Sequence, residues 1–240
     1  MYLILDIGNT RVKKAIYEAD HLIAVDAFDK AFFHQEIEKT AQEFAIDKAI
    51  FSAVGELTKH DKHLINSYFD CMELTATTPL PFANQYETPG TLGVDRIALS
   101  AAAVDAFPDK NVLIIDAGTC ITYDFITQNK EYVGGAISPG LRSRYKSLSD
   151  YTQNLPLLDK KTPHSFIGIN TEEAIHSGVV NGVCREIDGV IAQYRASYKK
   201  LTIVLTGGDA DFLSSQLKSS IFVRPFFLLE GLYSILKYNL

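Results

Sequence analysis

The sequence predicts an α/β protein of two domains that share one order of elements, βββαβαβα, and face each other across a cleft. Two observations predict this fold. An apolar strand that ends in an aspartate and runs into a glycine turn occurs twice, as LILDIGNT (3–10) and LIIDAGTC (113–120). After each copy come two short strands and then alternating helical and strand patterns. We therefore expect a duplicated fold, with one domain at 1–110 and the other at 111–240.

The first half begins with three strands joined by turns too short for anything but hairpins. A helix follows, because Phe33, Ile37, Ala41 and Phe44 recur at helical spacing. The predicted elements are, in order, strands 2–8, 11–18 and 21–27, helix 30–44, strand 48–54, helix 60–69, strand 71–75, a loop over 78–93 and helix 94–106.

The second half repeats this order. Its predicted elements are strands 111–116, 120–127 and 131–137, helices 140–149 and 171–197, strand 201–206, helix 209–217, strand 221–224 and helix 226–238. Asp6 and Asp116 therefore hold equivalent places at the end of the first strand of each half. We expect both acids on the floor of the cleft.

The composition is that of a folded protein, with 47% hydrophobic and 22% charged residues. The formal net charge of −6 gives no basic field for nucleic acid or an anionic membrane, so neither is an expected partner. No apolar run approaches the roughly 18 residues of a membrane helix, and no signal peptide is apparent. Cys71, Cys120 and Cys184 lack metal-ligand spacing, which favours reduced thiols. We expect a cytoplasmic protein.

The two aspartate turns are candidates for phosphate binding. The sequence contains neither a Walker A motif nor GxGxxG, so a tight hairpin with exposed N–H groups is the remaining way to hold phosphates. Gly8 permits close approach of an anion, Asn9 and Thr10 add donors, and Lys13 adds a charge. Asp6 would hold water on Mg²⁺, which keeps several waters when few carboxylates bind it.

An ordinary β-turn explains DIGNT equally well, because glycine and asparagine are typical turn residues. The second copy favours the phosphate-binding interpretation. A third segment, LTGGDADF (205–212), ends a strand with two glycines and opens a helix, which suits contact with a nucleotide or a plain strand–helix turn.

Over nearly its whole length the chain resembles the type III pantothenate kinases, within the acetate/sugar-kinase, Hsp70 and actin superfamily. The residues that carry the resemblance are DIGNTRVK (6–13), Tyr86, Pro89, GVDR (93–96), DAGTCITYD (116–124), GGAISPGL (134–141), Asn170-Thr171 and LTGGDA (205–210). The resemblance implies two ribonuclease-H-like domains of the actin type. It also implies ATP-dependent phosphorylation of pantothenate to 4′-phosphopantothenate, the first step of coenzyme A biosynthesis.

The resemblance also implies roles for individual residues. The implied ATP-binding residues are Asp6, Ile7, Gly8, Asn9, Thr10, Arg11, Val12, Lys13 and Thr119. The implied pantothenate-binding residues are Tyr86, Gly93, Val94, Asp95, Arg96 and Thr171, with Asp95 as the catalytic base. Asp116 would hold a monovalent cation, K⁺ or NH₄⁺, beside MgATP. The usual oligomeric state of the family implies a homodimer, with the substrate site at its interface.

The chemistry of Asp95 and Arg96 fits an acceptor with one carboxylate and one primary hydroxyl. An arginine can grip a carboxylate with paired donors. The helix dipole should keep Asp95 ionised and therefore a weak base, which is sufficient when the hydroxyl proton leaves late. Taken without the resemblance, the same pair reads as an ordinary N-terminal acid and a surface arginine.

Three further interpretations remain open at this stage. The apolar stripe of the 171–197 helix is explained by core packing, whereas Gly178 and Gly182 suggest a helix-to-helix dimer contact. Asp124 could assist the cation or have a structural role, which we favour. The chain could also be a non-catalytic nucleotide- or pantothenate-binding regulator, or a phosphohydrolase of the same superfamily.

Overall fold

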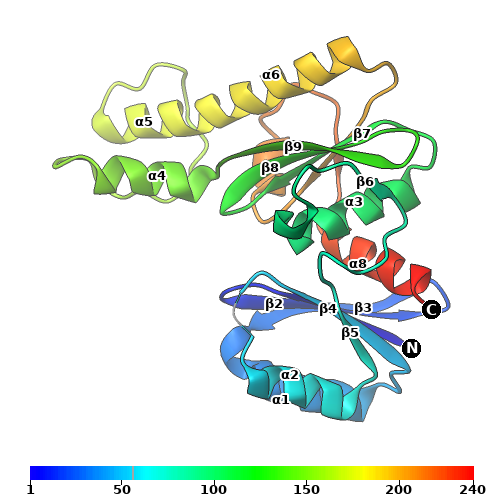
Figure 1. Cartoon of the computed structure of the whole chain (residues 1–240). Coiled ribbons are helices and arrows are strands. Elements are labelled where there is room, and N and C mark those ends of the chain that lie inside the picture. Colours follow the sequence, from blue (N-terminus) through cyan, green and yellow to red (C-terminus); the bar gives the residue numbers. More distant parts are fainter. Residues whose placement is uncertain (56) are drawn as a thin grey trace. The chain divides into compact units, whose positions relative to one another are not determined.

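A computed structural model describes residues 1–55 and 57–240 and confirms the predicted α/β fold (Figure 1). The chain forms two compact units. Unit 1 contains Met1–Pro108, Lys130–Tyr132 and Phe226–Leu240, and unit 2 contains Asp109–Asn129 and Val133–Pro225.

The sheet of unit 1 has the strand order β3-β2-β1-β4-β5. Its strands are β1 (Tyr2–Ile7), β2 (Arg11–Glu18), β3 (His21–Asp29), β4 (Lys48–Ala53) and β5 (Cys71–Glu73). The first three form an antiparallel meander, whereas β4 and β5 continue the sheet in parallel beside β1. The acid-bearing strand β1 is therefore central, which explains why Leu3, Ile4 and Leu5 are fully buried.

Two pairs of helices complete unit 1. One pair lies along one face of the sheet and consists of α1 (Phe33–Glu43) and α2 (Lys59–Tyr68) (Figure 1). A short 3₁₀ turn, Lys30–Phe32, precedes α1. The other pair, α3 (Val94–Ala106) and α8 (Phe227–Tyr238), packs together, and α8 also contacts β1 and β4. The crossing of α3 and α8 depends on Gly231, because a Cβ there would lie 1.8 Å from the carbonyl oxygen of Ala98.

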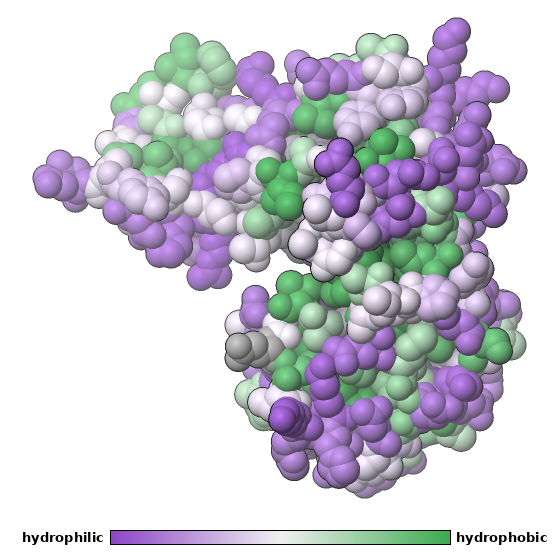
Figure 2. All heavy atoms as spheres, viewed as in Figure 1, coloured by the Kyte–Doolittle hydropathy of each residue, from purple (hydrophilic) through white to green (hydrophobic). Residues whose placement is uncertain are grey.

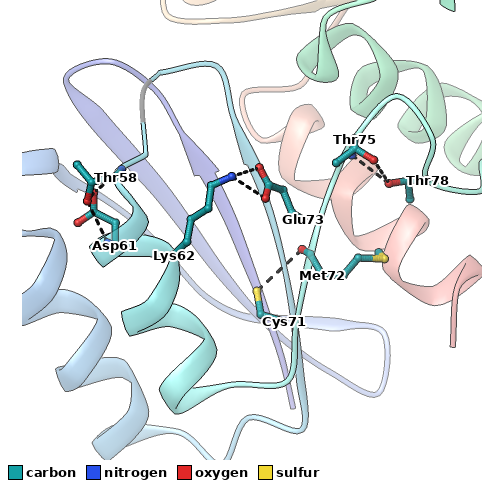
Figure 3. A network of polar contacts seen from close by, with 8 residues as sticks. All are labelled: Thr58, Asp61, Lys62, Cys71, Met72, Glu73, Thr75 and Thr78. Atoms are coloured by element: carbon teal, nitrogen blue, oxygen red, sulfur yellow. Dashed lines mark hydrogen bonds and ion pairs between the residues drawn. The ribbon is translucent and has the colours of Figure 1, made fainter. Parts of the chain in front are cut away.

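Helix α2 is fixed at its first turns by polar contacts (Figure 3). Thr58 and Asp61 form a reciprocal capping box, which satisfies N–H groups that the helix leaves unpaired. One turn later Lys62 pairs with Glu73 of β5 at 2.7 Å. These contacts hold the segment that follows β4 in place.

The sheet of unit 2 repeats the strand order of unit 1, as β11-β10-β7-β8-β9. Its strands are β7 (Val112–Ala117), β8 (Cys120–Ile126), β9 (Glu131–Pro139), β10 (Thr202–Thr206) and β11 (Phe222–Val223). β7 pairs antiparallel with β8 and parallel with β10, as β1 pairs with β2 and β4. The predicted duplication is therefore present in the topology.

The helices of unit 2 enclose a core that includes the apolar stripe predicted from the sequence. They are α4 (Leu141–Asp150), α5 (Thr171–His176), α6 (Gly182–Ser197) and α7 (Ala210–Ser214), with a π-helical turn at Ser177–Asn181 between α5 and α6. Val183, Ile187 and Ile191 are fully buried in this core. Core packing therefore accounts for the stripe.

The structure differs from the predicted elements in three places. A two-residue strand, β6 (Ala83–Asn84), and a 3₁₀ turn at Pro89–Thr91 lie in the segment predicted as a loop, and β6 pairs with Glu131 and Tyr132 of β9. Helix α7 is shorter than predicted. Helix α8 belongs by its contacts to unit 1. The domain limits 1–110 and 111–240 stay a prediction.

Candidate active site

The first aspartate turn connects β1 to β2 in unit 1. Asp6 is the penultimate residue of β1 and lies opposite Lys13 of β2. The N–H of Gly8 donates to the carbonyl of Arg11 at 3.0 Å, which closes the turn. Asn9 and Thr10 form its exposed tip. The tip therefore presents donors to solvent while its base is fixed by the sheet.

Neighbouring segments hold this tip in place. The N–H groups of Val54 and Gly55 point at the carbonyl of Ile7, at 3.2 and 3.4 Å, and the N–H of Lys30 donates to the carbonyl of Thr10 at 2.9 Å. A Cβ at Gly55 would lie 2.9 Å from both the Asn9 side-chain oxygen and the Gly8 carbonyl. A glycine is therefore required where the end of β4 meets the turn.

Not every residue expected to bind ATP presents its side chain at this turn. Ile7 and Val12 are fully buried apolar residues of the strands, so only their backbone is available to a ligand. The guanidinium of Arg11 donates to the carbonyl of Ala27 at 3.1 Å on β3. Lys13 and the tip residues are thus the side chains left for phosphate.

Asp6 occupies a partly buried site between opposing charges. Burial raises the pKa of its carboxyl above the ordinary value, Lys13 and a 3.2 Å hydrogen bond from Ser52 lower it, and Asp95 raises it again. Asp95 is the weakest of these four influences, and both carboxylates belong to unit 1.

The start of helix α3 presents Asp95 in a defined orientation. Gly93 is the N-cap residue, and the Asp95 carboxylate accepts the N–H of Arg96 at 2.9 Å. A Cβ at Gly93 would lie 2.4 Å from that carboxylate oxygen. The carboxylate therefore folds back over the N-terminus of the helix. Val94 fills the first helical position.

Arg96 is buried, with 6% of its surface exposed. Its guanidinium carbon lies 5.7 Å from the ring centre of Tyr86, the residue that the resemblance assigned to the same substrate site. This burial excludes the interpretation of Arg96 as an ordinary surface arginine.

The second aspartate turn lies in unit 2. Asp116 of β7 is opposite Thr122, and the N–H of Gly118 donates to the carbonyl of Cys120 at 2.8 Å. The carbonyl of Thr119 accepts the N–H of Gly140 at 3.1 Å and the hydroxyl of Ser143 at 2.8 Å. Thr119 itself is exposed, so its hydroxyl is accessible to a ligand.

The end of β10 packs directly on the Asp116 carboxylate. Gly207 has a φ of +95°, and a Cβ there would lie 2.3 Å from an Asp116 carboxylate oxygen. Glycine is therefore needed for both its backbone conformation and its lack of a side chain. Asp124 is fully buried and accepts the Thr122 hydroxyl at 3.0 Å, which supports a structural role for it.

Thr171 is the first residue of α5, whose N-cap Asn170 accepts the N–H of Glu173 at 2.9 Å. It lines a cavity of about 580 Å³ in unit 2, together with Arg144, Leu148 and Gly178. The predicted site residues thus fall into two groups. Residues 6–13, Tyr86 and 93–96 lie in unit 1, and Asp116, Thr119 and Thr171 lie in unit 2.

The donor set fits a divalent ion that arrives with a nucleotide. Among the described residues no cluster of three or more His, Cys, Asp or Glu side chains could form a protein-built metal cage. A single carboxylate such as Asp6, acting through water on an ion bound mainly by phosphates, is the arrangement that Mg²⁺ tolerates.

Sequence reasoning missed Ser52, Gly55 and Tyr132. The SAVG segment that ends β4 carried the only local signal, a glycine after a buried strand. No local sequence pattern indicated Tyr132, which lies near Arg96 and pairs with Asn84 of β6.

Comparison with known proteins gives consistent matches. A family model described as type III pantothenate kinase matches residues 2–193. A type III pantothenate kinase from Flavobacterium johnsoniae is 46% identical over 241 residues, covering 100% of this chain and 99% of that protein. One from Christiangramia forsetii is 47% identical over 240 residues, covering 100% and 99%.

A solved glucokinase from an Antarctic psychrotroph is similar in fold, with a TM-score of 0.55 and 12% identity over 99% of this chain and 98% of that chain. At this identity the likeness concerns the fold alone.

Proposed function

Because the chain belongs to the type III pantothenate kinase family, we propose that its first aspartate turn binds the phosphates of ATP while Asp95 and Arg96 bind pantothenate. The activity that follows from the family is ATP-dependent phosphorylation of pantothenate to 4′-phosphopantothenate in coenzyme A biosynthesis, with a divalent metal ion accompanying ATP. The observation that carries the residue assignment is the start of α3, where the Asp95 carboxylate is held by the N–H of Arg96 and the buried Arg96 lies over the ring of Tyr86. A candidate base and a candidate carboxylate-binding group are thus adjacent.

The exposed tip of the first turn supports binding of the ATP phosphates. Asn9 and Thr10 are exposed, so their N–H groups are accessible to an anion. Lys13 adds a positive charge, and Asp6 would hold a water of the metal ion. Bound Mg²⁺ would neutralise charge on the transferring phosphoryl group.

Asp95 and Arg96 would position the acceptor. The Asp95 carboxylate, held over the N-terminus of α3, accepts the hydrogen bond of the substrate hydroxyl, orients it and takes its proton late in the transfer. The guanidinium of Arg96 binds the substrate carboxylate through paired N–H groups. The resemblance assigns Tyr86, Gly93, Val94 and Thr171 to the same substrate.

The second turn would bind a monovalent cation and contact ATP through Thr119. Asp116 has a neutral residue, Thr122, in the place that Lys13 occupies opposite Asp6. The resemblance assigns K⁺ or NH₄⁺ to the Asp116 carboxylate. Gly207 keeps side-chain atoms away from this carboxylate.

A homodimer is part of the same proposal. A Cβ at Gly178, Gly182 or Gly189 would meet no atom within 4 Å, so one face of the α5–α6 region is open for a close neighbour. Apolar surface gathers at the end of unit 2 that carries α4 and α5 (Figure 2), and Phe166, Ile167 and Ile169 are exposed there. A monomeric mass in light scattering at micromolar concentration would contradict this assembly.

A cytoplasmic location also belongs to the proposal, because ATP is the phosphoryl donor and all three cysteines are free thiols. Within the residues described, none of the helices has the length and apolar character needed to cross a membrane.

The test is production of ADP from MgATP with and without pantothenate, each with and without K⁺. Turnover that requires both pantothenate and K⁺ supports the acceptor, the reaction and the Asp116 assignment together. Turnover that ignores K⁺ would remove that assignment only. Phosphate release without an acceptor would favour a phosphohydrolase, and absence of turnover in folded protein would favour a non-catalytic binding protein.

Replacement of the proposed base gives a second test. Asp95→Asn keeps the shape of the side chain and should lower kcat about 100-fold or more, with MgATP binding retained. Asp105→Asn alters an exposed acid later in the same helix and is the matched control. Retained turnover in Asp95→Asn would refute its role as base.

A further inference from the structure

The end of strand β10 meets the second aspartate turn at one edge of the unit 2 sheet. β10 lies parallel to β7, so the carboxyl ends of both strands reach the same edge. The N–H of Asp209, which ends the short turn Gly207–Asp209 after β10, donates to the carbonyl of Ala117 at 2.9 Å. In open α/β sheets ligands bind outside the carboxyl ends of the strands. Asp209 therefore lies at the edge that also carries Thr119, the residue proposed to contact ATP.

The carboxylate of Asp209 does not serve its own helix. Asp209 is the N-cap residue of α7 but makes no side-chain hydrogen bond to that helix, which is the usual reason for an aspartate at this position. Its carboxylate instead forms an ion pair with the ammonium group of Lys160, and only 15% of the Asp209 side chain is exposed. Helix capping therefore does not explain this acid, and its recorded partner is a distant lysine.

Lys160 comes from the connection between α4 and α5, residues 151–170. Leu155 and Leu158 of this connection pack against the core of unit 2. The ammonium group of Lys160 also lies 5.4 Å from the ring centre of Phe212 in α7. The ammonium group is thus fixed at the start of α7 by an acid and a ring, on a segment that the core holds in place.

The pair changes the charge of this edge. An ionised carboxylate repels the phosphates of a nucleotide, and the repulsion grows where water is partly excluded. Asp116 already places one acid at the same edge, and a monovalent cation is proposed to accompany it. A second acid without a cation would add to the repulsion, whereas Asp209 paired with Lys160 adds no net charge.

We propose that Lys160 is a positioning residue for MgATP that acts through Asp209, by cancelling the charge of this carboxylate beside the second turn. The inference rests on the proposed contact between the second turn and ATP. Lys160 itself does not need to touch the nucleotide. Loss of its ammonium group leaves the Asp209 carboxylate uncompensated, so the affinity for MgATP falls.

The experiment compares Lys160→Met, Asp209→Asn and the double variant in steady-state ADP production. Lys160→Met keeps an apolar side chain of similar length and should raise the KM for MgATP about fivefold, with kcat and the KM for pantothenate within about twofold of the wild type. Asp209→Asn removes the repelling charge and should leave all three parameters within about twofold. The double variant should therefore recover the KM of the wild type.

A purely structural tie between the two segments predicts a different pattern. Each single variant would then break the tie and impair the enzyme to the same extent, and the double variant would be no better. That pattern would overturn the proposal. Added NaCl gives a second readout, because salt screens the interaction between separated charges. The difference in KM between Lys160→Met and the wild type should shrink as NaCl is added, and a difference that does not change would contradict the electrostatic mechanism.

Lys161→Met and Asp211→Asn are the matched controls. Both replace exposed neighbours of the pair and make the same changes of charge. Their KM for MgATP should stay within about twofold of the wild type, because exposed charges are screened. An equal rise in Lys161→Met would show that the net charge of the chain, and not the pair, sets the affinity. Thermal unfolding of all variants controls for loss of fold.

Thr119→Val separates failure of this inference from failure of the proposed function. A raised KM for MgATP in Thr119→Val with a normal KM in Lys160→Met would overturn the role of Lys160 and keep the second turn as an ATP contact. A normal KM in both variants would overturn the role of Lys160 and also remove the ATP contact of the second turn. Wild-type protein without pantothenate-dependent turnover would refute the proposed activity itself.

Discussion

The two aspartate turns are built from the same parts but differ in the charge placed opposite the acid. Each ends a central strand, contains a glycine after the acid and lies beside a parallel strand, β4 or β10. Asp6 faces Lys13, whereas Asp116 faces Thr122. The proposed ligands of the two acids differ as well, a hydrated metal ion with phosphates at Asp6 and a monovalent cation at Asp116.

The turns also differ in what fixes them. The first has an exposed two-residue tip, and N–H groups of neighbouring segments donate to the carbonyls of Ile7 before the tip and of Thr10 within it. The second is one residue shorter, and its Thr119 carbonyl is held by Gly140 and Ser143 at the start of α4. The duplicated framework therefore surrounds its two turns with different contacts.

The largest expected effect separates the two acids. Asp6→Asn should lower turnover about 10- to 100-fold at every K⁺ concentration, because it loses a group that holds the metal's water. Asp116→Asn should reduce the rate only to that of the wild type without K⁺. Steady-state ADP production over a K⁺ titration measures both.

Two results would contradict this division. One is K⁺ activation that survives in Asp116→Asn, and the other is a normal rate in Asp6→Asn. Circular dichroism and thermal unfolding of both variants control for loss of fold.

The next effect concerns stability around the second acid. Gly207→Ala should lower the free energy of unfolding by about 2–4 kcal/mol, because its φ of +95° disfavours alanine and the new Cβ would meet Asp116. Gly208→Ala is the matched control, since a Cβ there meets no atom within 4 Å. Urea unfolding of the two variants measures this difference. Equal stability of the two variants would show that the structure relaxes around the new Cβ at little cost in free energy.

A smaller effect should distinguish the glycines of the turns themselves. At Gly8 a Cβ would lie 3.0 Å from the Arg11 carbonyl oxygen, but at Gly118 the nearest atom, the Cys120 carbonyl oxygen, is 3.9 Å away. We expect Gly8→Ala to cost about 1 kcal/mol of unfolding free energy and Gly118→Ala about half of that or less. The reverse order in urea unfolding would contradict the assignment of the first turn as the tighter one.

The smallest expected effect is a difference in how the contributions of Glu186 and Asp6 to stability depend on pH. Burial opposes ionisation of Glu186, but hydrogen bonds from Arg144, Ser138 and Tyr123 lower the pKa of its carboxyl below the ordinary value. Its contribution to stability is present above the unfolded-state pKa and is lost as the pH falls through the lowered value. The pKa of Asp6 is raised, so its contribution has the opposite sign and is lost as the pH rises.

Acidification should therefore lower the local stability of α4 beside the second turn. It should not lower the local stability of the first turn. Hydrogen-exchange protection of Arg144 and its neighbours should fall between pH 7 and pH 4 by under about 1 kcal/mol relative to β1. Glu186→Gln should abolish this difference. A difference that persists in Glu186→Gln would assign it to another group.

Local patterns in the sequence were sufficient for most of the fold. Apolar runs such as 112–115 are continuous and bounded by turn residues, so their strands were predicted within about two residues of the observed limits. The position of Asp6 and Asp116 followed from the same runs.

What could not be predicted depends on partners far apart in the chain. The two residues of β6 form a strand only because Glu131 and Tyr132 pair with them. The GVDR segment reads as surface in isolation, whereas Arg96 is buried by rings from two other segments. The sequence pattern of 226–238 predicted a helix with an apolar face, but it did not show that α3 would pack against that face.

The place of α8 has a consequence for synthesis on the ribosome. Gly231 and its neighbours complete the packing of α3, yet they are among the last 15 residues, Phe226–Leu240, that belong to unit 1. The nascent chain therefore carries an unfinished N-terminal core while all of unit 2 is translated. Folding of unit 1 can be completed only after Phe226–Leu240 have been synthesised, so unit 2, which lies between its parts in the sequence, can complete its own core first.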